Sequence, residues 1–219
     1  MSSDSPYAYP ALEQRHLASP RLFADRLELI RALAFPAPPL VAEVGVAHGD
    51  FSEFLIRTLA PARFVAFDFF NLHEHEFVWS YRTSELFEGK THGDYYAGRM
   101  AALGAAVEVR AGNIAETLDG IEDGGFDLIY VDAGHEYADV ARDAAVAVRK
   151  MKPGGLLIFN DYIMVDHHYG TPYGVVRAVN ELVNASDWKV VGFALQQQMF
   201  SDIALCRGPA PWAQPNITP

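Results

Sequence analysis

The stretch Leu40-Val-Ala-Glu-Val-Gly-Val-Ala-His-Gly-Asp50 joins a short apolar run to two glycines, Gly45 and Gly49. Such a run, when it ends in glycines, is typical of a buried strand followed by a turn. Gly45 can form the tight turn, and Gly49 lets the following helix approach the sheet closely. Because residues 51–59 then have helical spacing, the stretch predicts a strand, a loop and a helix in succession.

Apolar runs alternate with helical segments along the rest of the chain. Strands are expected over 63–68, 106–112, 126–132, 155–161, 188–194 and 199–207, and helices over 20–35, 136–150 and 172–185. This alternation predicts an α/β fold with a Rossmann-like, doubly wound sheet of seven mostly parallel strands. Only about four residues separate the last two strands. A parallel crossover needs more, so the last strand is expected to run antiparallel to its neighbour.

Two local signals add boundaries to this prediction. The turn residues Lys152-Pro-Gly-Gly155 are expected to precede the strand over 155–161, and Pro172 is expected in the first turn of the helix over 172–185. For the whole chain we expect an N-terminal arm and helix over 1–35 that acts as a lid. A ligand-binding domain follows over 36–208, with an insertion at about 69–100, and a tail over 209–219 ends the chain.

Composition narrows the class of protein. The 219 residues are 50% hydrophobic, enough for one domain with a substantial core, and the formal net charge is −11. Such a charge repels nucleic acid, so we expect a small-molecule partner. We find no apolar run near the roughly 18 residues of a membrane span and no signal-peptide layout. The single cysteine, Cys206, favours a reducing, cytoplasmic location, while a homo-oligomer stays possible.

Polar side chains follow nearly every predicted strand. In chain order, the expected strand ends are Glu43 to Gly49, Asp68, Gly112-Asn113, Asp132 and Asn160-Asp161. In an open α/β sheet, ligands bind beyond the carboxyl ends of the strands. The polar strand ends therefore predict a binding site along this edge of the sheet.

The loop at Gly45 differs from a dinucleotide-binding loop, because it lacks the Gly-x-Gly-x-x-Gly spacing and Glu43 precedes its first glycine. A carboxylate at that place repels a pyrophosphate and attracts a cation. Asp68 can accept hydrogen bonds from both hydroxyls of a ribose. A nucleoside with a cationic amino-acid part describes S-adenosylmethionine. The residues expected to bind this cofactor here are Glu43, Gly45, Val46, Gly49 and Asp68.

These motifs, with Asp127-Leu-Ile-Tyr-Val-Asp132, Lys152-Pro-Gly-Gly155 and the expected terminal hairpin, resemble a class I S-adenosylmethionine-dependent methyltransferase. The resemblance covers roughly residues 25–207. It implies that Asn113 contacts the adenine, although an Asx turn explains this asparagine nearly as well. It also implies that Asp132 belongs to the cofactor site.

A second group of residues ends two strands that the fold places side by side. Asp132, Asn160 and Asp161 are expected to converge there, and oxygen ligands favour a hard cation such as Mg²⁺. Asp-x-x-His-x-Tyr, followed by Lys-Pro-Gly-Gly and Asn-Asp-Tyr, resembles metal-dependent O-methyltransferases acting on sugars of macrolide-type and related natural products. In the catechol-type branch the pair is Asp-Asn, so the reversed order here leaves the individual metal ligands open.

The resemblance implies a direct, in-line transfer of the methyl group to an acceptor that the protein positions. A divalent ion would lower the pKa of a bound alcohol, and His135 would take its proton. Asp132 or His135 could serve as the base in a metal-free enzyme. In a purely structural role, His135 would instead cap the helix from residue 136 and pack on Tyr137.

The insertion is rich in histidine and aromatic residues. A zinc or iron site is one interpretation of His73, His75 and His92, but a polar and aromatic substrate lid fits their loose scatter better. Aromatic residues expected to line a pocket or a dimer contact are Phe77, Trp79, Tyr81, Tyr95 and Tyr96.

The favoured function is metal-assisted O-methylation of a small hydroxylated metabolite, such as a sugar or a polyketide-derived natural product, by S-adenosylmethionine. Metal-free N- or O-methylation and a non-catalytic S-adenosylmethionine-binding partner protein are the alternatives. A nicotinamide-dependent dehydrogenase is the least favoured, because a reversed terminal hairpin is uncommon among doubly wound folds.

Overall fold

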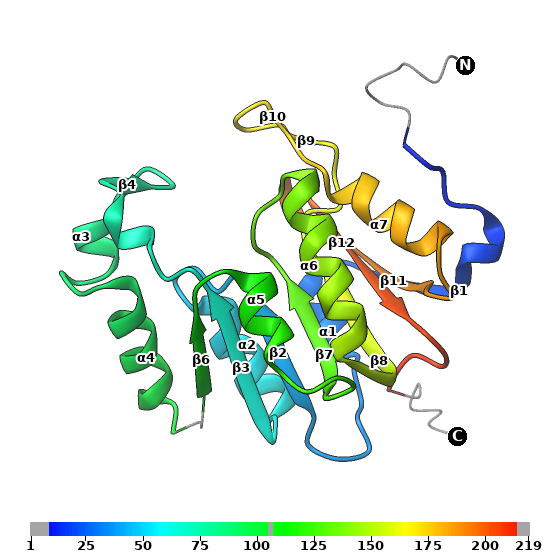
Figure 1. The fold of residues 1–219 in the computed structure, drawn as a ribbon, viewed down its shortest axis with the longest axis horizontal. Coiled ribbons are helices and arrows are strands. Elements are labelled where there is room, and N and C mark those ends of the chain that lie inside the picture. Colours follow the sequence, from blue (N-terminus) through cyan, green and yellow to red (C-terminus); the bar gives the residue numbers. More distant parts are fainter. Residues whose placement is uncertain (1–8, 105–106, 214–219) are drawn as a thin grey trace.

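The computed structural model describes residues 9–104 and 107–213, and in this part of the chain eight strands form one sheet (Figure 1). The order of the strands is β1-β11-β12-β8-β7-β2-β3-β6. Their bounds are β1 (Leu17–Phe23), β2 (Leu40–Val44), β3 (Arg63–Asp68), β6 (Val107–Ala111), β7 (Phe126–Val131), β8 (Met151–Phe159), β11 (Lys189–Leu195) and β12 (Ser201–Cys206). The start of the predicted arm (1–8), the start of the predicted strand (106) and the end of the predicted tail (214–219) lie outside the described residues.

The predicted Rossmann-like sheet is confirmed, with one strand more than the seven expected. Strand β12 runs antiparallel to both of its neighbours, β11 and β8, whereas the other pairs of the sheet are parallel. The short connection between β11 and β12 forces this reversal, as the sequence predicted.

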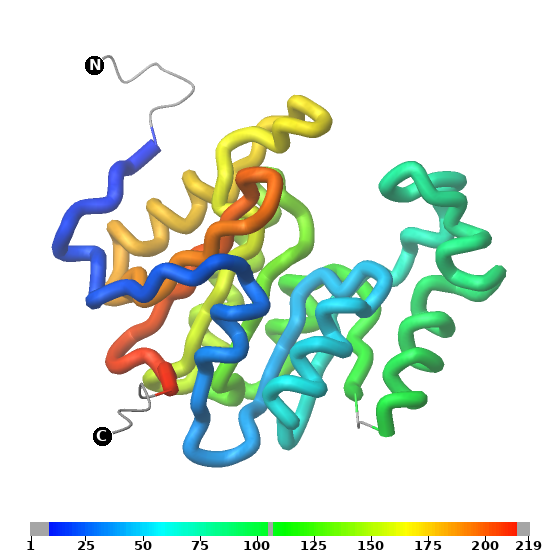
Figure 2. The backbone as a smooth tube through the Cα atoms, turned by 180° about the vertical axis from the view of Figure 1, so that it is seen from behind, coloured from blue at the N-terminus to red at the C-terminus, as the bar shows by residue number. Residues whose placement is uncertain are grey.

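Helices cover both faces of the sheet (Figures 1 and 2). Their bounds are α1 (Arg26–Arg31), α2 (Asp50–Leu59), α5 (Ile114–Asp119), α6 (Tyr137–Lys150) and α7 (Val175–Asn184). Helices α5, α6 and α7 lie on the face turned to the viewer in Figure 1, and α1 and α2 lie on the face seen in Figure 2. The sheet is therefore the middle layer of three.

The core follows from the alternation of side chains along the strands. In β3, Val65 and Phe67 pack into the core beneath α5, α6 and α7. Phe64 and Ala66 pack into the opposite core, beneath α1 and α2. Both faces of β3 are buried, which explains why it reads as a continuous apolar run.

The N-terminal segment differs from the helix expected over 20–35. Its first part is β1, which pairs with β11 at the edge of the sheet, where Pro20 can be accommodated. Helix α1 starts only after Asp25, whose side chain accepts a hydrogen bond from the Glu28 N–H at 2.8 Å. Leu22 is 68% exposed on β1, so its helical spacing did not mark a buried helix face.

Two further boundaries are corrected. Met151 pairs with Phe126 and Leu156 pairs with Leu128, so Lys152-Pro-Gly-Gly155 forms a bulge inside β8 and not a turn before it. Pro172 lies in the short strand β10, and α7 begins at Val175, because the chain first forms a small hairpin.

Smaller elements stand at the edges of the sheet. They are η1 (Gln14–His16), η2 (Leu72–Glu74), β4 (Phe77–Val78), β5 (Tyr81–Arg82), α3 (Thr83–Leu86), α4 (His92–Ala102), β9 (Val165–Asp166), β10 (Thr171–Pro172) and η3 (Gln197–Met199). The hairpins β4–β5 and β9–β10 both rise at the carboxyl end of the parallel strands (Figure 1). Among the described residues, the helices are too short or too polar to cross a membrane.

Candidate active site

A cavity of about 570 Å³ opens at the carboxyl ends of β2, β3 and β7. We call it the site cavity. Its volume lies in the usual range for small-molecule sites. The predicted site residues that line it are Glu43, Gly45, Val46, Gly49, Asp68, Asp132, His135 and Asp161, whereas Asn113 and Asn160 are not among its lining residues.

The loop between β2 and α2 forms one wall of the site cavity. Gly45 has a φ of +84°, and a Cβ atom there would lie 2.1 Å from the main-chain oxygen of Asp132. Its N–H donates to the main-chain oxygen of Phe67 at 2.7 Å. The loop can therefore lie directly against the end of β7 only because residue 45 has no side chain.

Glu43 lies beneath this loop and is almost fully buried. Its carboxyl accepts a hydrogen bond from the Ser52 hydroxyl, which in turn accepts one from the Tyr96 hydroxyl at 2.9 Å. Burial raises the pKa of Glu43 well above its usual range. Glu43 is thus held in place by α2 and α4 and is readily protonated when no cation is near.

Asp68 ends β3 and joins two loops through its carboxylate. One oxygen accepts a hydrogen bond from the Val46 N–H at 2.9 Å, and the other accepts one from the Phe70 N–H at 2.8 Å. Each oxygen keeps a lone pair for a further hydrogen bond. The carboxylate is consequently fixed at the mouth of the cavity and can still accept from a ligand.

The insertion braces the loop between β2 and α2, a role that the sequence did not reveal. The buried His92 ring donates to the main-chain oxygen of Ala47 at 2.5 Å, and Arg99 donates to that of His48 at 2.9 Å. His48 in turn donates through Nε2 to the main-chain oxygen of Leu86 at 3.1 Å. The histidines at 48 and 92 therefore tie α3 and α4 to the loop, and no signal in the sequence joined these distant residues.

The side chain of Asn113 caps a helix, a role that differs from both the adenine contact and the Asx turn suggested by the sequence. It is the N-cap of α5, and its side-chain oxygen accepts a hydrogen bond from the Glu116 N–H at 3.2 Å. The next residue, Ile114, lines the site cavity. The structure thus brings the main chain at this strand end to the cavity, but not the Asn113 side chain.

Asp132, His135 and Asp161 meet at the other side of the cavity. The Nε2 atom of His135 lies 3.8 Å from an Asp132 oxygen and 3.4 Å from an Asp161 oxygen. This nitrogen is buried without a hydrogen-bond partner. Asp161 has a φ of +52°, a conformation that costs energy in a residue with a side chain and often marks functional sites.

The protonation of this trio is set mainly by burial. Burial raises the pKa of Asp161 to about 7, and the nearby charges of Asp132 and Asp202 act in the same direction. Burial also raises the pKa of Asp132, while Arg26 opposes the change. Burial lowers the pKa of His135, so this imidazole is neutral near pH 7.

Asn160 is not among the residues that line the site cavity. Its amide nitrogen donates to Asp202 at 2.9 Å, and Asp202 also accepts from the Tyr130 hydroxyl at 2.6 Å. Asp202 is fully buried on β12, the reversed strand. The amide is therefore used to satisfy a buried carboxyl, and the structure does not bring Asn160 to the cavity as the third predicted metal ligand.

Arg26, at the start of α1, is a site residue that the sequence did not single out. Its guanidinium lies 3.3 Å from an Asp132 oxygen and 3.4 Å from the Tyr130 hydroxyl, with its carbon 4.4 Å from the centre of the Phe51 ring. It is the one Lys or Arg among the described residues that line the cavity. The acidic side chains of the lining are Glu43, Asp50, Asp68, Asp132 and Asp161.

A divalent cation fits part of this arrangement. Mg²⁺ commonly takes one or two carboxylates and completes its shell with water and substrate. Asp132 and Asp161 can supply those carboxylates, since both approach the unpartnered nitrogen of His135. In residues 9–104 and 107–213, no group of three or more His, Cys, Asp or Glu side chains is arranged to hold a metal ion, the histidines of the insertion included.

Comparison with known proteins gives a family match. A family model described as a methyltransferase domain matches residues 42–162. No curated protein sequence matches the chain. The O-methyltransferase TomG from Streptomyces achromogenes, involved in tomaymycin synthesis and solved in complex with SAM, is 23% identical over 83% of this chain and 78% of that chain, with a TM-score of 0.55. The B. subtilis tRNA methyltransferase TrmK is 15% identical over 85% and 67%, with a TM-score of 0.56.

Proposed function

Because the chain belongs to the methyltransferase domain family, as a class I S-adenosylmethionine-dependent enzyme, we propose that it methylates a hydroxyl oxygen of a small metabolite with the help of a divalent cation. Hydroxylated natural products and sugars are the expected acceptors. The observation that carries this proposal is the approach of Asp132 and Asp161 to one nitrogen of His135, beside the loop that follows β2.

In this proposal, the cofactor occupies the half of the cavity formed by the loop and β3. Asp68 accepts the ribose hydroxyls, and the cationic end of the cofactor lies toward the acidic side chains. Because Gly45 and Gly49 have no side chains, the loop can lie close to the main chain of Asp132 and to the Tyr96 ring, which shapes this half of the cavity. The N-terminal segment reaches the cavity through Arg26, beside Asp132, and is the proposed lid.

The acceptor occupies the other half, where its oxygen must lose a proton as it attacks the methyl group. The neutral His135 ring can take that proton, and Asp132 and Asp161 hold the imidazolium that forms. A bound divalent ion would lower the pKa of the acceptor hydroxyl and fix its oxygen. The in-line geometry of the displacement depends on both ligands being held by the rigid ends of β2, β3 and β7.

A small acceptor suits the charge of this site better than a nucleic acid does. The lining of the cavity carries five carboxyl side chains and one guanidinium, and the whole chain has a net charge of −11. A phosphate backbone would be repelled from such a surface. The single cysteine, Cys206, is buried and not in a disulfide, which supports a reducing compartment such as the cytoplasm.

The test is methyl transfer from S-adenosylmethionine to hydroxylated acceptors before and after treatment with EDTA. We expect EDTA to lower the rate at least about tenfold, Mg²⁺ to restore it, and Asp161→Asn to abolish the restoration. Asp119→Asn, an exposed carboxyl on α5 that pairs with Arg149, is the matched control. A full rate after EDTA, together with loss of the rate in His135→Gln, would replace this proposal with metal-free catalysis.

A further inference from the structure

We propose that Trp79 selects the acceptor, by holding the flat apolar face of an uncharged ring against the wall that Tyr173 and His135 form across the site cavity. This inference rests on the proposed function and names the class of acceptor for the same site. It predicts a planar, hydroxylated ring in preference to a saturated sugar.

The β4–β5 hairpin holds Trp79 at its tip in an unusual way. Phe77 pairs with Arg82 and Val78 pairs with Tyr81, which leaves a turn of two residues, Trp79 and Ser80. Both have positive φ, +48° and +70°. A turn of this type strongly favours Asn-Gly, because other side chains rarely adopt such φ values. Glycine would adopt these φ values with less strain than tryptophan does, so a tryptophan at this position indicates a functional role for its ring.

Trp79 lies on the cavity and is also open to solvent. Its side chain lines the site cavity and is 53% exposed, a large apolar surface left uncovered by the protein itself. Phe69, also about half exposed, and Leu72 line the cavity from the same insertion. On the outer side of the hairpin, Arg82 lies over the Phe77 ring at 4.8 Å. The insertion thus presents an apolar wall with one uncovered indole.

Tyr173 and His135, which also line the site cavity, form an aromatic stack. The Tyr173 ring lies 4.4 Å from the His135 ring at an angle of 14°. Gly174 holds this segment against α6, because a Cβ atom there would lie 2.2 Å from the main chain of Tyr137. The Gly174 N–H also donates to the main-chain oxygen of His135 at 2.7 Å. The main chain that carries these two rings is therefore held in place, and a flat ring entering the cavity could stack on them.

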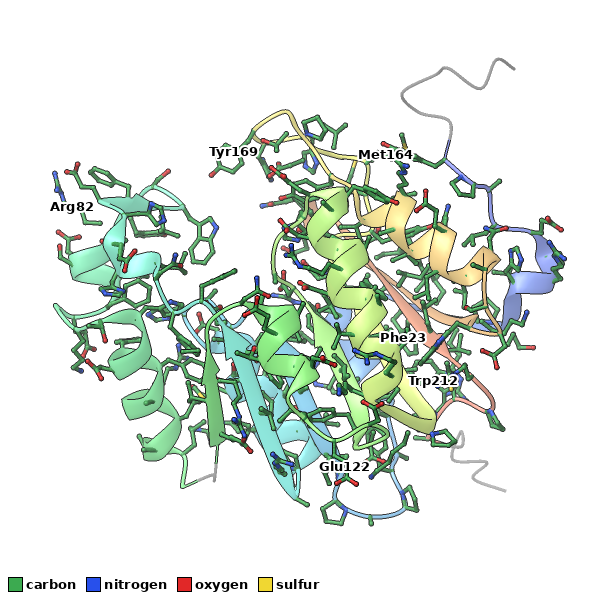
Figure 3. The ribbon with its side chains drawn as sticks, viewed as in Figure 1. Phe23, Arg82, Glu122, Met164, Tyr169 and Trp212 are labelled. Carbon is green, nitrogen blue, oxygen red and sulfur yellow. The ribbon has the colours of Figure 1, made fainter. Side chains whose placement is uncertain are left out.

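Figure 3 shows how the two hairpins flank this region. Arg82 marks the β4–β5 hairpin and Tyr169 marks the β9–β10 hairpin, and both stand above the carboxyl ends of the parallel strands. Tyr169 is 70% exposed, and Val165 on the same hairpin is also exposed. Among the described residues of the two hairpins, Trp79 lines the site cavity, whereas Val165 and Tyr169 do not.

The acceptor half of the cavity combines acidic groups at its bottom with apolar walls. Asp132 and Asp161 at the base of the acceptor half repel a carboxylate or phosphate on the acceptor. The insertion lines the cavity with the apolar side chains of Phe69, Leu72 and Trp79 and with one amide, that of Asn71, whereas the carboxyl groups of the acceptor half are those of Asp132 and Asp161. An uncharged ring fits between the apolar walls, and one or two hydroxyls on it can point at the carboxyl groups of Asp132 and Asp161.

The test measures binding, so that it does not depend on turnover or on a metal. Catechol, its carboxylated analogue 3,4-dihydroxybenzoate and methyl α-L-rhamnoside serve as probes in calorimetry with S-adenosylhomocysteine present. We expect catechol to bind at least about tenfold more tightly than the other two. Trp79→Ala should weaken catechol about tenfold, and Trp79→Phe should restore most of the loss.

Fluorescence supplies a second measurement on the same protein. Trp188 is buried and Trp212 packs 5.2 Å from the Phe23 ring, so catechol should quench mainly Trp79. Trp212→Phe, the matched control, should leave the quenching and the affinity unchanged. Equal catechol affinity in the wild type and Trp79→Ala would overturn the proposal. Catechol that binds through Trp79 but is never methylated would instead overturn the proposed function alone.

Discussion

Replacement of Gly45 by alanine tests the close contact on which the site depends. The added Cβ atom would lie 2.1 Å from the main-chain oxygen of Asp132 and 2.7 Å from the Cα atom of Ala133. Both neighbours are main-chain atoms, so no side chain can turn away to make room. Either the loop after β2 or the end of β7 must move by about 1 Å to reach ordinary contact distance.

Two costs add in this variant. A side chain at a φ of +84° costs about 1–2 kcal/mol, because alanine disfavours the left-handed region. Forcing extra volume into a packed contact costs about 1–3 kcal/mol more. We therefore expect Gly45→Ala to lower the free energy of unfolding by about 2–5 kcal/mol and to weaken cofactor binding, since the loop and Asp132 are displaced together.

Urea unfolding and calorimetry with S-adenosylmethionine provide the two measurements. Gly98→Ala is the matched control, because Gly98 lies on the exposed side of α4 with nothing within 4 Å of the added atom. It should increase stability by up to about 1 kcal/mol through helix propensity. A Gly45→Ala protein as stable as the wild type, with unchanged cofactor affinity, would refute the view that this contact builds the site.

Three further predictions concern charged residues. Asp68→Ala should weaken S-adenosylmethionine by about 1.5–3 kcal/mol, because charged hydrogen bonds are lost; unchanged calorimetric affinity would reject its proposed role at the ribose. Arg26→Ala should lower the methylation rate more at pH 6 than at pH 8, because Arg26 lowers the pKa of Asp132 and its loss favours the protonated acid; an equal loss at both pH values would argue against this. Asp161→Asn should raise the free energy of unfolding in EDTA by about 2–4 kcal/mol at pH 8 and have little effect at pH 4. The reason is that the pKa of Asp161 is about 7 in the folded state and 3.8 in the unfolded state. The wild-type carboxyl therefore loses stability as the pH rises from 3.8 to 7, and the neutral asparagine does not. Equal changes at both pH values would contradict that sign.

The mostly parallel sheet and the reversal of β12 could be predicted because they depend on local signals, whereas the order of the strands in the sheet was not predicted. Apolar runs, glycine turns and the length of the last connection are all visible within a few residues. The N-terminal segment shows the limit of such signals. Leu22, Leu27 and Leu29 suggested one helix, yet pairing with β11, far along the chain, turns the first part into a strand. Tertiary contacts override local propensity here.

Some features of the candidate site could be predicted from the sequence, and others could not. Glu43, Gly45, Asp68, Asp132 and Asp161 could be named because the carboxyl ends of parallel strands must meet at one edge of the sheet. The direction of a side chain at such an end could not be predicted. Asn160 and Asp161 are adjacent in the chain, but only Asp161 lines the cavity, because the buried carboxyl of Asp202 on β12 binds the Asn160 amide.

The sequence alone therefore determined the class of fold and the edge of the sheet at which most of the predicted strand-end residues gather. These depend on periodicity and on short spacings, which the chain carries locally. Only the tertiary structure decided that Arg26 reaches Asp132, that α4 supports the loop after β2, and that Trp79 and Tyr173 line the same cavity. Those relations join residues that are far apart in the chain, and they arise only when the sheet, the N-terminal segment and the insertion pack together.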